Sequence, residues 1–69
     1  MMITVNGTDQ QVAEGATVAD VVDRWHPGAA GQRGVAVAID RTVVPRTRWA
    51  ETTVTAGTRV EFVTAVQGG

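Results

Sequence analysis

The sequence has 69 residues, which is enough for one small domain. It contains no cysteine, no serine and a single histidine, His26, which excludes disulfides, thiolate zinc sites and cysteine or serine nucleophiles. The formal net charge is −1 and no basic run occurs, so the electrostatic footprint of a nucleic-acid-binding protein is missing. No apolar stretch approaches the roughly 20 residues that cross a bilayer, and no signal-peptide pattern precedes the first predicted strand. We therefore expect a cytoplasmic protein without a membrane partner.

The N-terminal residues predict a β-hairpin. Residues 2–5 alternate between apolar and polar side chains, as a half-buried strand does. Asn6-Gly7 follows, and this dipeptide suits a type I′ turn because both of its central positions need a positive φ. Residues 8–12 then form the predicted return strand, which Gly15 closes.

A helix is predicted next, from about Val18 to Trp25. Thr17 is placed as its N-cap, and Asp20 stands three residues later, where a capping box usually has glutamate. Pro27-Gly28 ends the pattern. Four apolar residues recur at i, i+3, i+4 and i+7 and so share one face: Val18, Val21, Val22 and Trp25.

The second half of the chain predicts three strands. Residues 34–39 form a central strand with Ala36 and Ala38 on one face and larger residues on the other. After a turn at Asp40-Arg41, residues 42–44 form a short strand that Pro45 ends, because proline cannot donate to a ladder. Residues 46–53 predict a short 3₁₀ or irregular turn, and residues 59–64 the last strand.

This order of elements predicts an α+β fold in which one main helix packs on a mixed sheet of four to five strands. The commonest small fold with this order is the β-grasp, the ubiquitin-like fold. We expect a single domain over residues 1–69, with residues 65–69 as a flexible C-terminal tail. The residues predicted to form the core are Ile3, Val5, Val12, Val18, Val21, Val22, Val35, Val37, Ile39, Val60 and Phe62.

Internal residues offer little catalytic chemistry. His26 falls at the helix end without other histidines or cysteines to share a metal, so a structural role is favoured. Trp25 and Trp49 are interpreted as core or core-edge residues. Arg46 and Arg48 form a small positive spot, which is either simply solvated or a contact for a partner.

The C-terminal Gly68-Gly69 is the strongest candidate site. Two glycines can pass through a channel too narrow for any side chain and adopt whatever φ and ψ a partner's active site requires. The α-carboxylate at the end of such a segment is ionised at neutral pH and could attack the α-phosphate of ATP. The alternative is a glycine-rich end without function, because chain termini are often disordered.

Several stretches resemble the ThiS family, the sulfur carriers of thiamine thiazole biosynthesis. They are the run Val-Ala-Val-Ala-Ile-Asp at 35–40, Val-Val-Pro-Arg at 43–46 with Trp49, Gly57 with Arg-Val-Glu at 59–61, and the terminal residues 65–69. Asp40 departs from the family pattern, where asparagine is common, and Ala-Gly-Thr at 56–58 replaces an Asp-Gly-Asp turn. Both departures concern turn chemistry.

The resemblance implies a mechanism and partners. A ThiF-type enzyme would use ATP to adenylate Gly69, sulfur from a cysteine desulfurase would convert it to a thiocarboxylate, and the thiazole synthase ThiG would consume that sulfur. The protein would then be a co-substrate rather than an enzyme, with no cofactor or metal of its own. For docking to these partners we predict an outward-facing apolar surface with two arginines at its rim: Ala36, Ala38, Val63, Ala65 and Val66, with Arg46 and Arg48.

Other readings stay open at this stage. MoaD, the small subunit of molybdopterin synthase, shares the fold, the tail and the thiocarboxylate chemistry, and other sulfur-carrier pathways also exist. A ubiquitin-like modifier joined to target lysines is a different class; the chain has no lysine, which excludes only lysine-linked polymers of itself. A β-grasp interaction module with an irrelevant tail is a third class.

Overall fold

The computed structural model describes residues 1–27 and 35–64, and it begins with the predicted hairpin. Strand β1 (Met2–Val5) pairs with β2 (Thr8–Gln11) in antiparallel fashion. Asn6 has φ 50° and Gly7 has φ 83°, the positive values that a type I′ turn requires. The turn prediction is therefore confirmed, and the return strand ends one residue earlier than expected.

Helix α1 spans Val18–Trp25, as predicted, and its N-terminal cap is formed as the sequence indicated. The Thr17 hydroxyl accepts from the Asp20 N–H at 3.2 Å, and the Asp20 carboxylate accepts from the Thr17 N–H at 2.9 Å. This reciprocal capping box satisfies two backbone donors that the first helical turn leaves open. In residues 1–27 and 35–64, no helix is long and apolar enough to span a membrane.

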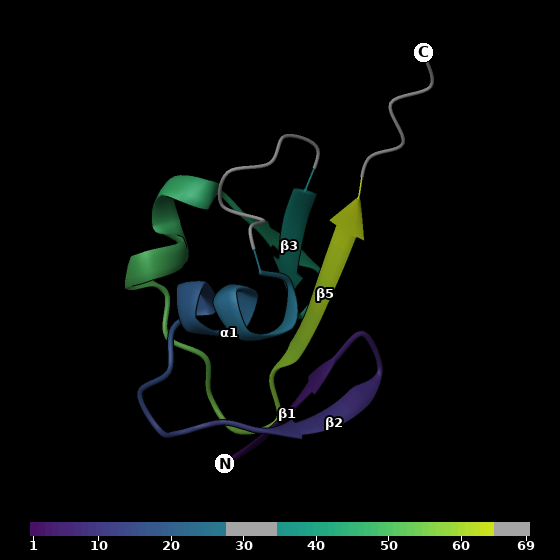
Figure 1. The fold of residues 1–69 in the computed structure, drawn as a ribbon, viewed down its shortest axis with the longest axis vertical. Helices are drawn as coiled ribbons and strands as arrows, with labels where there is room; N and C mark the ends of the chain where they lie inside the picture. The colour runs from purple at the N-terminus through teal and green to yellow at the C-terminus, as the bar shows by residue number, and fades with distance from the viewer. Residues whose placement is uncertain (28–34, 65–69) are drawn as a thin grey trace.

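The remaining strands complete one mixed sheet across which α1 lies (Figure 1). Strands β3 (Val35–Ile39) and β4 (Thr42–Val44) form a second hairpin, and β5 (Arg59–Thr64) lies between β3 and β1. The order is β2-β1-β5-β3-β4, and only the β1–β5 pair is parallel. The prediction of an α+β fold with a mixed sheet and one main helix is confirmed.

A 3₁₀ helix, η2 (Arg46–Glu51), follows β4 and packs against α1. The chain then runs beside the start of α1, where the Val18 N–H donates to the Thr52 carbonyl and the Val54 N–H donates to the Ala16 carbonyl. These two bonds hold the capped end of the helix against residues 52–54. They also explain why Val54 is almost completely buried.

The core is built chiefly of valine and lies between α1 and one face of the sheet. Nine of the predicted core residues are buried, whereas Ile39 and Phe62 are only partly buried against it. Ile39 lies at one end of the β3–β5 ladder, opposite Val60, whereas Phe62 lies at its middle, opposite Val37. Trp49 and Val54 are fully part of the core. Val54 was not predicted, because it follows the isolated bridge between Thr17 and Thr53 and lies in no strand whose periodicity would reveal a buried position.

Val22 tests the assignment of the buried helix face. Its side chain is 1% exposed, so Val22→Asp would place a charge without a partner in the apolar layer. We expect a loss of at least about 3 kcal/mol in the free energy of unfolding, measured by chemical denaturation. Asp23→Ala, on the exposed side of the same helix, serves as the control. A Val22→Asp value within about 0.5 kcal/mol of wild type, the usual surface range, would contradict the assignment.

Candidate functional site

The candidate C-terminal site follows β5, a strand that is paired with a neighbour on each of its two edges. Strand β5 pairs with β3 over residues 60–64 and with β1 through Arg59 and Val60. Thr64 is the last described residue, so Ala65, Val66, Gly68 and Gly69 lie outside the described part of the chain. Five residues separate Thr64 from the end of the sequence, and such a segment reaches at most about 17 Å when extended.

The face of the sheet opposite α1 carries an apolar patch beside the end of β5. Cross-strand partners share a face, and here Ala36 lies opposite Val63 while Ala38 lies between Val43 and Glu61. Val63 is 53% exposed and Val43 is 63% exposed. We call Ala36, Val43 and Val63 the outer apolar patch.

The burial of Ala38 differs from what was predicted for the docking surface. It was expected to face outward together with Ala36, but it is buried, with 9% of its surface exposed. It does point away from α1, yet the longer side chains of Val43 and Glu61 stand directly beside it on the neighbouring strands. A methyl group between two larger neighbours is covered by them, so Ala38 fills the sheet surface under the patch.

Val43 is a patch residue that the sequence analysis missed. Its strand was predicted, but a three-residue strand does not reveal which of its residues face the core. The pairing of Val43 with Ala38 decides this, and that register is a tertiary property.

Arg46 and Arg48 are both exposed on η2, on the helix side of the sheet. The Arg46 guanidinium carbon lies 5.4 Å from the centre of the Trp49 ring, and the Trp49 indole N–H donates to the Val44 carbonyl at 3.0 Å. Since Trp49 belongs to the core, it anchors η2 on the face opposite the patch. The structure therefore does not place the two arginines within the outer apolar patch.

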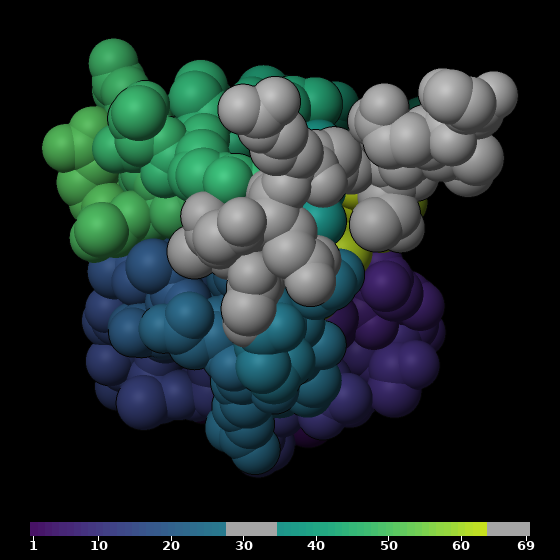
Figure 2. All heavy atoms as spheres, turned by 45° about the horizontal axis from the view of Figure 1, so that its top comes forward, coloured from purple at the N-terminus to yellow at the C-terminus, as the bar shows by residue number. Residues whose placement is uncertain are grey.

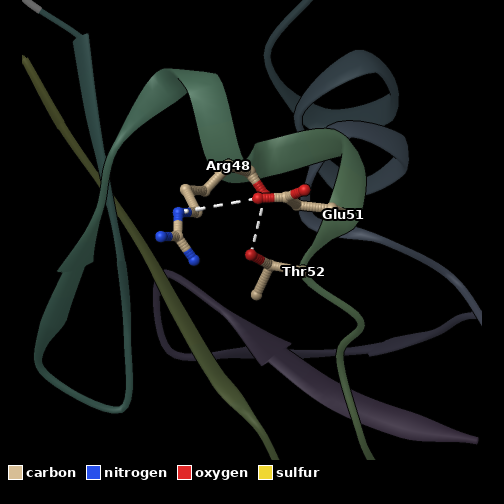
Figure 3. A network of polar contacts seen from close by, with 3 residues as sticks. All are labelled: Arg48, Glu51 and Thr52. Atoms are coloured by element: carbon tan, nitrogen blue, oxygen red, sulfur yellow. Dashed lines mark hydrogen bonds and ion pairs between the residues drawn. The ribbon is translucent and has the colours of Figure 1, made fainter.

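Arg48 takes part in a small surface network (Figure 3). Its Nε lies 3.5 Å from a Glu51 carboxylate oxygen, and both side chains are about two-thirds exposed. The Thr52 hydroxyl donates to the Arg48 carbonyl at 2.7 Å and closes the end of η2. An exposed ion pair of this kind contributes little to stability, so a competing carboxylate on a partner could replace Glu51.

The remaining polar side chains of the described residues were considered for a metal site. In residues 1–27 and 35–64, His, Asp and Glu side chains do not gather in groups of three that could hold a metal ion. His26 lies at the C-cap of α1, with its ring edge-on to Phe62 at 5.6 Å between centroids. Arg24 lies over the Trp25 ring at 4.6 Å, beside a hollow of about 320 Å³ between α1 and the segment before it.

The order of elements, the parallel pairing of the first and last strands and the single helix across the sheet define a small β-grasp protein. The model of the ThiS family matches residues 3–69. The chain therefore belongs to the ThiS family.

Solved structures agree with this assignment. A crystal structure of the thiamine biosynthesis protein ThiS from Geobacter metallireducens shares 32% identity, covers 100% of both chains and gives a TM-score of 0.81. An NMR structure of a thiamine biosynthesis protein from the same organism also shares 32% identity. It covers 100% of this chain and 88% of its own, with a TM-score of 0.76. The comparison with curated proteins gave no match.

The contrast between Ala38 and Val63 can be tested by introducing the same side chain at both positions. Ala38→Glu must force a long side chain between Val43 and Glu61 and places two carboxylates opposite each other. We expect it to lower the free energy of unfolding by about 1–3 kcal/mol. Val63→Glu, at an exposed position, should cost less than about 1 kcal/mol. Equal costs in chemical denaturation would contradict the burial assigned to Ala38.

Proposed function

We propose that this protein is the sulfur carrier for thiazole formation in thiamine biosynthesis. The observation that carries the proposal is that the ThiS family model extends to Gly69, the last residue, and so includes the terminal Gly68-Gly69. The Geobacter metallireducens relatives, described as thiamine biosynthesis proteins, support the choice of pathway.

The chemistry proposed for Gly69 has three steps. A carboxylate oxygen attacks the α-phosphorus of ATP, a C–O–P anhydride forms, and pyrophosphate leaves. A persulfide from a cysteine desulfurase then attacks the acyl carbon of this adenylate, and AMP leaves with the electron pair of the broken C–O bond. Reduction of the resulting acyl disulfide by a thiol releases the thiocarboxylate.

The protein acts here as a co-substrate, and its partners supply the catalytic groups. ATP is held by a ThiF-type adenylating enzyme, and a ThiG-type thiazole synthase consumes the sulfur. The glycines provide slimness and conformational freedom, because residues without a Cβ can pass a narrow channel and adopt any φ and ψ. The described residues form the folded domain that each partner binds while the terminus reacts.

The outer apolar patch is the proposed docking surface for these partners. Two exposed valines beside Ala36 present apolar area on the face of the sheet opposite α1, where a partner could cover it. The patch lies at the end of the sheet from which the chain leaves β5, since Val63 is the penultimate residue of that strand. Ala65 and Val66 would extend the contact along the tail, and Arg46 and Arg48 would reach a partner only at its rim.

The carrier chemistry is tested by intact mass after incubation with ATP, a ThiF-type enzyme and a sulfur donor. We expect the mass to rise by the difference between sulfur and oxygen and to return on hydrolysis or delivery to the synthase. Deletion of Gly69 should abolish the shift, because it withdraws the carboxylate by one residue. Gly68→Val should impair the shift, because it adds a β-branched side chain where the channel is narrow.

Both tail variants should unfold like the wild type, because the core found in residues 1–27 and 35–64 is built from residues between Ile3 and Val60, none of which is changed. Thiazole formation at the wild-type rate by the protein that lacks Gly69 would refute the carrier function. The carrier function would also be refuted if the mass of the wild-type protein stayed unchanged while the same enzyme modified an independent carrier protein, which serves as the positive control.

Docking through the outer apolar patch is tested by the affinity of Val63→Glu for the adenylating enzyme and for the synthase. Burial of a valine at an interface stabilises the complex by about 1.5–3 kcal/mol. We therefore expect at least a tenfold weaker affinity for one partner or both. Ala13→Glu, an equally acidic change at an exposed position before α1, is the control. Unchanged affinity of Val63→Glu for both partners would remove the patch from the docking surface.

A further inference from the structure

Two turn residues hold β5 by the same pattern of hydrogen bonds. At the start of the strand, the Asp40 N–H donates to the Arg59 carbonyl and the Arg59 N–H donates to Asp40 Oδ1, both at 2.8 Å. Farther along the strand, the Asn6 N–H donates to the Val60 carbonyl and the Phe62 N–H donates to Asn6 Oδ1, both at 2.9 Å. In each pair of bonds, a side-chain oxygen stands where a ladder would use the main-chain carbonyl.

The backbone conformation explains this substitution. Asn6 and Asp40 are the first central residues of their hairpin turns, with φ values of 50° and 48°. A residue in this left-handed conformation leaves the strand, so its own carbonyl no longer continues the ladder. Asparagine and aspartate tolerate the conformation and carry an oxygen short enough to reach the same place. Asn6 therefore extends the β1–β5 pairing by one hydrogen bond beyond Val5–Val60.

The bond from Asn6 reaches the second half of β5, on the edge that β3 does not cover. Hydrogen-bonded and non-hydrogen-bonded pairs alternate in an antiparallel ladder, and the exchange between Asp40 and Arg59 sets the phase. It follows that the Phe62 N–H points away from β3, toward the β1 side, where Asn6 accepts it. Phe62 is two residues before the end of β5. The β1–β2 hairpin lies beside the visible part of that strand in Figure 2.

We propose that Asn6 is a positioning residue for the reaction at Gly69, because it secures the last part of β5 on the side that β3 does not cover. The inference rests on the carrier function proposed above. Its physical basis is the short reach of the tail: a carrier docked by its sheet face must present the carboxylate through only five residues. Both the direction and the starting point of those five residues depend on β5.

The size of the effect follows from the direction of β5. Strand β3 still pairs with Phe62, Val63 and Thr64 when the Asn6 oxygen is lost, so these residues stay in the sheet. The loss removes a restraint from the other edge of β5, and the direction in which the strand leads into the tail becomes less defined. Misorientation of the reacting group lowers the rate, since small displacements are costly in catalysis. We expect loss of the Asn6 oxygen to lower kcat/KM for adenylation of the carrier by roughly two- to tenfold.

The chain offers three informative variants. Asn6→Gly keeps the turn, because glycine adopts a positive φ, but removes the acceptor oxygen. Asn6→Asp keeps both the turn and an acceptor. Asp40→Gly is the matched control, because it removes the same kind of bond with the same change in backbone freedom at the start of β5.

Two measurements are made on each variant of the full chain. Amide hydrogen exchange by NMR should show the Phe62 N–H exchanging about two- to tenfold faster in Asn6→Gly, as loss of one hydrogen bond predicts, with little change in Asn6→Asp. Asp40→Gly should accelerate the Arg59 N–H instead. The kcat/KM of adenylation, at saturating ATP, should fall in Asn6→Gly and stay near wild type in Asn6→Asp and Asp40→Gly.

Each outcome either supports or contradicts the positioning role of Asn6. Selective exchange at Phe62 together with slower adenylation in Asn6→Gly alone supports the positioning role. Wild-type kcat/KM in Asn6→Gly despite lost protection overturns it, as does an equal loss in Asp40→Gly, which would show a general effect of stability. If the wild-type chain is not adenylated at all, the carrier function fails. The exchange data then show independently whether Asn6 holds β5.

Discussion

Strand β5 is hydrogen-bonded along both of its edges, and this double pairing makes one sheet out of two hairpins. The β1–β2 hairpin and the β3–β4 hairpin have no direct ladder between them, so each depends on β5 as its neighbour. Val60, near the start of β5, is completely buried and faces both the sheet neighbours and α1. In a chain without disulfides, this pairing and the valine core that it covers have to supply the stability of the domain.

The helix depends on the same arrangement through its capped end. An isolated helix of eight residues is not stable in water, even with a good capping box. Here the Ala16 carbonyl and the Val18 N–H bond to residues 52–54, which links the start of the helix to the segment that leads into β5. Trp49 adds a large buried side chain beside it, so η2 and α1 support each other.

This construction suits the proposed role, in which the chain terminus is delivered to a partner. The residue that reacts in the proposed chemistry needs a slender and adaptable segment, whereas recognition by several partners needs a fixed surface. The fold separates these requirements at the end of β5, with the outer apolar patch on one side of that boundary and the glycines on the other. Asn6 and Asp40 show that the strand at the boundary is secured by side chains where the neighbouring strands have already turned away.

The local sequence determined most of the elements, because their signals are short-range. The Asn6-Gly7 turn, the Thr17–Asp20 capping box and the valine stripe of α1 each depend on neighbours within a few residues, and all three appear as predicted. The terminal glycines and the run around Trp49 likewise indicated the ThiS family, which the comparisons confirm.

The contacts that a side chain makes across the sheet do not follow from such local signals. The burial of Ala38, the exposure of Val43, the burial of Val54 and the reach of Asn6 to Phe62 depend on register between segments up to 56 residues apart. Only the tertiary structure could decide these features, because strand register is chosen by the fit of the whole sheet and core and not by any one strand.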